Sequence, residues 1–138
     1  MNRENIEYMI GIMEEAEALD MNYFQNTSTF MEPSSETIEE LHKCGNTACF
    51  AGYMAISDKF QKDGGQSSEG APKINKLYED QAVAYWLDIS EELASDIVFP
   101  HHGLFGGKCY DDIKPRDVIQ VLKNILDGEY GEQHYDAA

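Results

Sequence analysis

A run of small residues near the middle of the chain constrains the fold more than any other feature of the sequence. Small side chains recur there at spacings of three and four, at Ala48, Ala51, Gly52 and Ala55. On a helix these positions share one face, and small side chains let a neighbouring segment approach that face closely. Asn46 or Thr47 is a suitable N-cap, since either side-chain oxygen can accept a hydrogen bond from the first turn. We therefore predict a helix here, at the centre of the fold.

Apolar residues recur at helical spacing in other segments as well. Over residues 5–19 they form the stripe of an amphipathic helix, at Ile6, Met9, Ile10, Met13 and Ala16. Further helices are predicted over about 74–87, over 90–98 with Ser90 as N-cap, and over 115–126. Pro115 suits the first turn of the last helix, and Gly128 suits its end. Residues 35–41 can form a short helical turn.

The remaining segments are read as connections. Residues 62–72 are rich in Gly and Ser and are expected to form a mobile surface loop. The polar tail over 129–138 is expected to fray. A chain of 138 residues without an internal repeat most simply forms one domain. The sequence thus predicts an all-α fold, a compact single acidic domain over 1–128 with four to six helices around the small-residue-rich central helix.

The formal net charge of −16 excludes several classes of partner. The chain has 26 acidic residues against 10 Lys and Arg, while its 42% apolar content is too high for a disordered acidic tail. Direct binding of DNA or RNA requires clustered Lys and Arg, and so does attachment to anionic lipid. We therefore expect a folded protein that binds neither nucleic acid nor membrane directly.

The sequence also bears on the compartment. No apolar run approaches the length of a membrane helix, and the first residues lack the basic start and apolar core of a signal peptide. The three cysteines, an odd number, argue against a disulfide framework. Reduced thiols are typical of the cytosol, so a cytoplasmic location is expected.

The segment from Cys44 to Tyr53 carries a resemblance to a known family. It resembles the C-G-T-x-x-C-x-A-G-aromatic signature of small uncharacterised proteins common in bacteriophages and bacterial genomes. Residues 20–24, 86–99 and 113–122 are similar to flanking parts of that pattern, in the same order. Asn46 stands where the family usually has Thr, and Asp88 where it usually has Gly. The resemblance implies a phage or prophage setting, with a host cytoplasm as the place of action, and supplies no catalytic residues.

The same region holds soft metal ligands. His42, Cys44 and Cys49 lie close in sequence, and Cys109 follows later, so a zinc-stabilised structural module is one hypothesis. The spacing differs from a standard zinc knuckle, and a thiol on an apolar helix usually behaves as a small hydrophobe. No metal or other cofactor is favoured. Cys44, just before a helix N-terminus, is also a candidate nucleophile, with His42, His101 or His102 as possible bases.

The sequence also suggests an anion site and contains adjacent carboxylate pairs. Exposed N–H groups at Gly45, Asn46 and Thr47 could cradle an anion, which makes a small-ligand or nucleotide-sequestering protein the alternative function. Adjacent carboxylate pairs such as Glu14 and Glu15 point about 100° apart on a helix, so they do not converge on one substrate atom. Enzyme activity is therefore not expected.

The acidity is unevenly distributed. Residues 1–42 contain ten acidic residues and one basic residue, a net −9, whereas residues 43–76 carry a net +2. Residues 77–112 and 113–138 carry −7 and −2. Spaced carboxylates can imitate a row of phosphates, so we expect an acidic interaction protein that inhibits a basic host or defence protein, as a DNA mimic does. The candidate partner-binding residues are Glu4, Glu7, Glu14, Glu15, Glu17, Glu36, Glu39 and Glu40.

Overall fold

A computed structural model describes the chain except for residues 17, 22–23, 25–36, 44–47, 101–102 and 137–138. Of residues 40, 42 and 43 it describes only the backbone. The elements follow one another as α1 (Arg3–Glu15), α2 (Ile38–Lys43), α3 (Phe50–Ala55), α4 (Asp58–Lys62), β1 (Gln66–Ser68), β2 (Ala71–Ile74), β3 (Leu77–Tyr78), α5 (Glu79–Leu87), α6 (Glu91–Val98), a 3-10 turn η1 (Tyr110–Asp112) and α7 (Pro115–Leu126).

The expectation of an all-α fold is wrong, because residues 66–78 form a three-stranded antiparallel sheet in the order β1-β2-β3. Ser68 pairs with Ala71 and Ile74 pairs with Leu77, so two residues make each turn. All four turn residues have positive φ, which is the geometry of tight hairpin turns. The segment 62–72, expected as a loop, therefore contains β1 and the start of β2. The helix expected from residue 74 begins only at Glu79.

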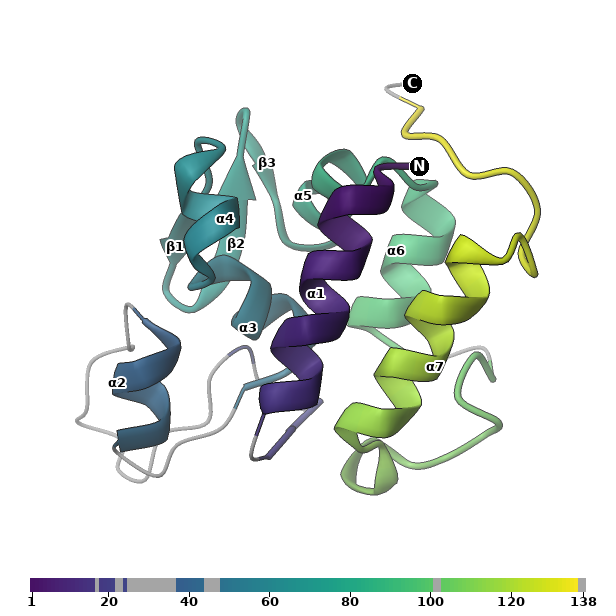
Figure 1. Cartoon of the computed structure of the whole chain (residues 1–138), viewed down its shortest axis with the longest axis horizontal. Helices are drawn as coiled ribbons and strands as arrows, with labels where there is room; N and C mark the ends of the chain where they lie inside the picture. Colours follow the sequence, from purple (N-terminus) through teal and green to yellow (C-terminus); the bar gives the residue numbers. More distant parts are fainter. Residues whose placement is uncertain (17, 22–23, 25–36, 44–47, 101–102, 137–138) are drawn as a thin grey trace.

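The small-residue helix α3 lies at the centre of the packing (Figure 1), in contact with α1, α5, α6 and two strands. All of its residues are buried. A Cβ atom on Gly52 would lie 1.7 Å from the carbonyl oxygen of Phe24, so a stretch of backbone passes directly over this position. The helix begins at Phe50 with Cys49 as its N-cap, so the prediction that Asn46 or Thr47 caps it is wrong.

Two helix pairs complete the core. α1 packs along α7, and α5 packs along α6 (Figure 1). Two predicted boundaries are confirmed: the Ser90 side chain accepts a hydrogen bond from the N–H group of Leu93, and α7 begins at Pro115. α1 ends at Glu15, four residues before the predicted end. Within the described ranges, no helix has the length and apolar character needed to cross a membrane.

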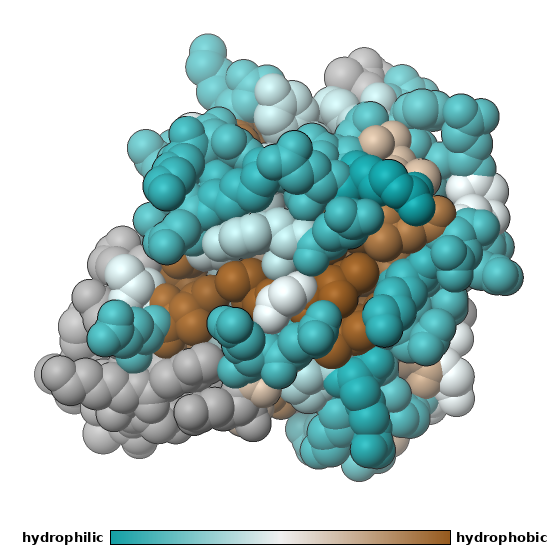
Figure 2. Space-filling view, in the orientation of Figure 1, coloured by the Kyte–Doolittle hydropathy of each residue, from teal (hydrophilic) through white to brown (hydrophobic). Residues whose placement is uncertain are grey.

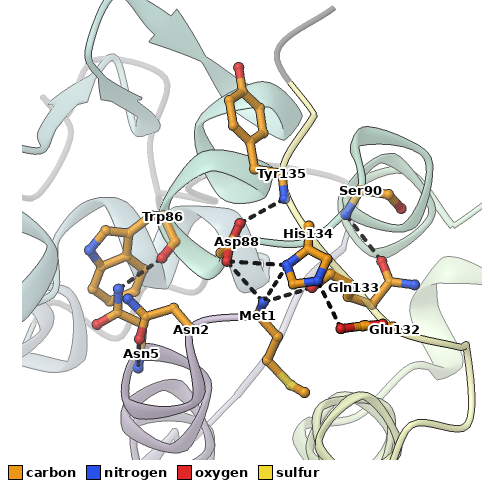
Figure 3. A network of polar contacts seen from close by, with 10 residues as sticks. All are labelled: Met1, Asn2, Asn5, Trp86, Asp88, Ser90, Glu132, Gln133, His134 and Tyr135. Atoms are coloured by element: carbon orange, nitrogen blue, oxygen red, sulfur yellow. Dashed lines mark hydrogen bonds and ion pairs between the residues drawn. The ribbon is translucent and has the colours of Figure 1, made fainter.

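Residues 130–135 of the C-terminal tail, which was expected to fray, make hydrogen bonds to one another and to the segment 88–90 (Figure 3). The side chain of Gln133 accepts a hydrogen bond from the N–H group of Ser90 and donates one to the carbonyl of Tyr130. Asp88 accepts from the N–H group of Tyr135 at 2.7 Å and pairs with the ammonium group of Met1 at 2.9 Å. These two contacts, the Tyr135 bond first, hold the pKa of Asp88 below its usual range.

Candidate protein-interaction groove

A groove of about 320 Å³ separates α1 from α2 and reaches the start of α4. We call it the α1–α2 groove and define it by the described residues that line it, Tyr8, Ile12, Glu15, Thr37, Ile38, Glu39, Ile56 and Asp58. Each of α1, α2 and α4 contributes one carboxylate. The groove is therefore assembled from segments far apart in the sequence, and only the folded chain brings them together.

The groove has an apolar floor beneath an acidic rim. Ile56 is fully buried, and Ile12 and Ile38 are half-buried against the core. Glu15, Glu39 and Asp58 are exposed. Figure 2 shows a band of hydrophobic surface across the face that carries α1, bordered by hydrophilic residues. Apolar surface next to unneutralised carboxylates suits a ligand that is both aliphatic and positively charged.

Ion pairs divide the predicted acidic residues into two groups. Glu4 lies 3.6 Å from Lys59, and Glu7 lies 4.0 Å from Arg3, so both are partly neutralised by this chain's own cations. Glu14, Glu15 and Glu39 have no Lys or Arg within ion-pair distance among the side chains that the structure describes. Among the predicted acidic residues whose side chains the structure describes, the three without a Lys or Arg partner therefore lie at the groove or at the end of α1.

Three of the predicted acidic residues cannot be placed. Glu17 and Glu36 lie outside the described residues, and so does the side chain of Glu40. Sequence reasoning missed the floor and Asp58. A signal for the floor existed in Ile12, which lies off the core-facing stripe of α1 and yet is a large aliphatic residue. An apolar residue on the acidic face of an amphipathic helix is a candidate contact residue.

An aromatic cluster supports the groove from behind. The ring of Tyr8, which lines the groove, meets the ring of Trp86 edge-to-face at 6.3 Å. Trp86 also packs edge-to-face on Phe60 and donates from Nε1 to Asp63 at 2.9 Å. This hydrogen bond is the main reason why the pKa of Asp63 lies below its usual range. Because Trp86 is the single tryptophan, its fluorescence reports on the neighbourhood of Tyr8.

The cysteines and histidines of the metal and nucleophile hypotheses are only partly placed. Cys44, His101 and His102 lie outside the described residues, as does the side chain of His42. Cys49 is buried and Cys109 is exposed, and both are free thiols. In the described part of the chain, no three His, Cys, Asp or Glu side chains are arranged to hold a metal ion. The sulfur of Cys49 accepts a hydrogen bond from the N–H group of Gly52, which gives it a capping role in the core.

The thiols should differ sharply in reactivity. Burial raises the pKa of Cys49 to about 11. The thiolate is the reactive form, so about one Cys49 in ten thousand would be ionised at neutral pH. We expect iodoacetamide to modify exposed Cys109 in the folded protein and to modify Cys49 only after denaturation, as measured by peptide mass spectrometry. Rapid labelling of Cys49 in the folded protein would show that α3 opens readily.

The anion-cradle hypothesis falls on Gly45, Asn46 and Thr47, which lie outside the described residues. The helix that was expected to follow them directly starts at Phe50. Its first-turn N–H group at Gly52 is already bonded to Cys49. The described residues therefore give no support to a ligand site at the start of α3.

A second pocket, of about 340 Å³, lies between α6 and the folded-back tail. Its carboxylates, Glu92 and Asp96, lie four residues apart on one helix, and Leu93 and Leu104 supply its apolar surface. The α1–α2 groove is the stronger candidate, because its three carboxylates converge from separate elements and two of them were singled out by the charge pattern.

Comparison of the chain with protein-family models, with curated proteins and with solved structures gives no match. The resemblance of the Cys44–Tyr53 segment to phage proteins therefore stays a prediction.

Proposed function

We propose that this protein acts by binding the basic surface of a partner protein, and that the α1–α2 groove is its principal contact site. The observation that carries the proposal is the convergence of Glu15, Glu39 and Asp58 around an apolar floor. A generic acidic surface solvates its charges separately, whereas this arrangement offers charge and apolar contact in one place. In interfaces that combine apolar contact and charge, burial of apolar surface supplies affinity, and complementary charges fix the relative position of the two proteins.

The net charge of −16 supports the same reading, since it accelerates association with a positively charged surface. Proteins that bind nucleic acid have such positively charged surfaces. We therefore extend the proposal: the protein inhibits a nucleic-acid-binding host or defence protein by occupying its phosphate-binding face. DNA and this protein should then compete for the partner. A ternary complex with both bound at full affinity would contradict the inhibition.

The setting is part of the same proposal. Action in the cytoplasm, in particular the cytoplasm of a phage-infected host, is supported by the free thiols of Cys49 and Cys109 and by the motif resemblance.

Neutralising the rim should weaken binding of a basic probe. The probe is a synthetic amphipathic helix with mixed Arg and Lys on one face and Leu on the other. Glu15→Gln combined with Glu39→Gln removes two rim charges. If each lost ion pair with the probe costs roughly 0.5–0.7 kcal/mol of binding free energy, the dissociation constant should rise about five- to tenfold. Titration calorimetry at about 50 mM and about 500 mM salt measures this, with weaker binding at high salt.

The matched control is Glu69→Gln combined with Glu129→Gln, which removes the same charge from exposed positions outside the groove. We expect this control to bind the probe as the unmodified protein does. Equal weakening in both double variants, or binding insensitive to salt, would contradict a role for the groove.

A further inference from the structure

The residues that line the α1–α2 groove indicate more about its ligand than the sign of the ligand's charge. Its floor consists of three isoleucines, Ile12, Ile38 and Ile56, which form an aliphatic surface inside a volume of about 320 Å³. A ligand that reaches this floor must bury an apolar stem while its charged end stays at the rim. Among protein side chains only Lys and Arg combine such a stem with a positive charge.

The rim distinguishes between these two side chains. Glu15, Glu39 and Asp58 come from α1, α2 and α4, so three separate elements each supply one carboxylate to the lining of the groove. A guanidinium group presents five N–H donors in a planar fork and can pair with more than one carboxylate at once. An ammonium group is a compact, strongly hydrated charge and loses more hydration when it settles against an apolar floor.

The wall of the groove adds a second distinction. The ring of Tyr8 lines it, and a guanidinium plane can stack on an aromatic face. The aromatic cluster already receives one cation of this chain, since Nζ of Lys59 lies 5.8 Å from the centre of the Trp86 ring. No Lys or Arg of this chain is among the described residues that line the groove itself.

We propose that the α1–α2 groove recognises an arginine side chain of the partner as its anchor, with the stem on the isoleucine floor, the guanidinium among the three carboxylates and its plane against Tyr8. This inference rests on the proposed function and names the residue type that the groove selects. Discrimination against lysine then comes from the wall and the rim geometry, because total charge is the same for both.

The test compares two short helical peptides of equal length and charge, one with only Arg and the other with only Lys as cationic residues. We expect the Arg peptide to bind about five- to tenfold more tightly and to change the fluorescence of Trp86 through its contact with Tyr8. Tyr8→Leu should reduce this preference to about twofold or less, whereas Tyr8→Phe, which keeps the ring, should retain it. Circular dichroism establishes that both variants are folded.

The possible results distinguish a failure of the arginine assignment from a failure of the proposed function. Equal affinity for the two peptides, lost in the Glu15→Gln, Glu39→Gln double variant, would overturn the arginine assignment and leave the groove as a general basic-segment site. An Arg preference that is undiminished in Tyr8→Leu would overturn the placement of the guanidinium plane against Tyr8. Absence of binding by either peptide would contradict the proposed function itself.

Discussion

Replacing Gly52 by alanine is expected to lower the free energy of unfolding by about 3–5 kcal/mol, a large share of the total stability of a small domain. The added Cβ atom would lie 1.7 Å from the carbonyl oxygen and 2.7 Å from the carbonyl carbon of Phe24. Backbone atoms cannot rotate aside as a flexible side chain can, so α3 or the Phe24 segment must move. Urea unfolding monitored by circular dichroism measures the loss.

Helix propensity makes the sign of this result informative. Alanine is favoured over glycine inside a helix by about 1 kcal/mol, so without the contact Gly52→Ala would stabilise the protein. Gly11 in α1 provides the matched control, since nothing lies within 4 Å of the Cβ that would be added there. Gly11→Ala should raise stability by about 0.5–1 kcal/mol. Stabilisation by both substitutions would mean that Phe24 does not pack over α3.

Truncating Trp86 to alanine should cost about 3–5 kcal/mol, because it removes the ring around which Phe60 and Tyr8 pack. Trp86 is 4% exposed, so the cavity would form inside the core. Trp86→Phe keeps an aromatic ring and loses the Nε1 hydrogen bond to Asp63, so most of the stability should remain. Thermal unfolding of the two variants tests this. If both lose stability equally, the hydrogen bond outweighs the ring packing.

The helices with strong local signals could be predicted from the sequence, and the sheet could not. Ser90 as N-cap and Pro115 in a first turn are local chemistry, and both mark helix starts in the structure. The strands contain only three, four and two residues, too few for an alternating pattern to show. Their turns are Glu69-Gly70 and Asn75-Lys76, and only Gly70 and Asn75 are common at positive φ. Composition made residues 62–72 resemble a loop, and the predicted helix over about 74–87 included the end of β2 and all of β3.

The sequence singled out two acidic residues of the candidate site but not the apolar floor between them. The excess of acidic residues before residue 43 led to Glu15 and Glu39, which line the groove. The floor depends on Ile12, Ile38 and Ile56, three residues from separate segments, lining the same groove. Proximity between distant segments produces no periodic pattern in a single sequence. Glu4 and Glu7 looked equivalent to Glu15 in the sequence, yet folding places Lys59 beside Glu4, and Arg3 pairs with Glu7 along α1. Only the three-dimensional arrangement separates neutralised from available carboxylates.

The central claim is that one groove, rather than the acidic surface as a whole, receives a basic partner. Amide chemical shifts of the isotope-labelled protein, followed while the mixed Arg and Lys peptide is added at about 150 mM salt, test it most directly. We expect the largest shifts at Ile12, Glu15, Ile38, Glu39 and Ile56. Shifts of similar size along every acidic helix, or shifts concentrated around Glu92 and Asp96, would contradict the claim.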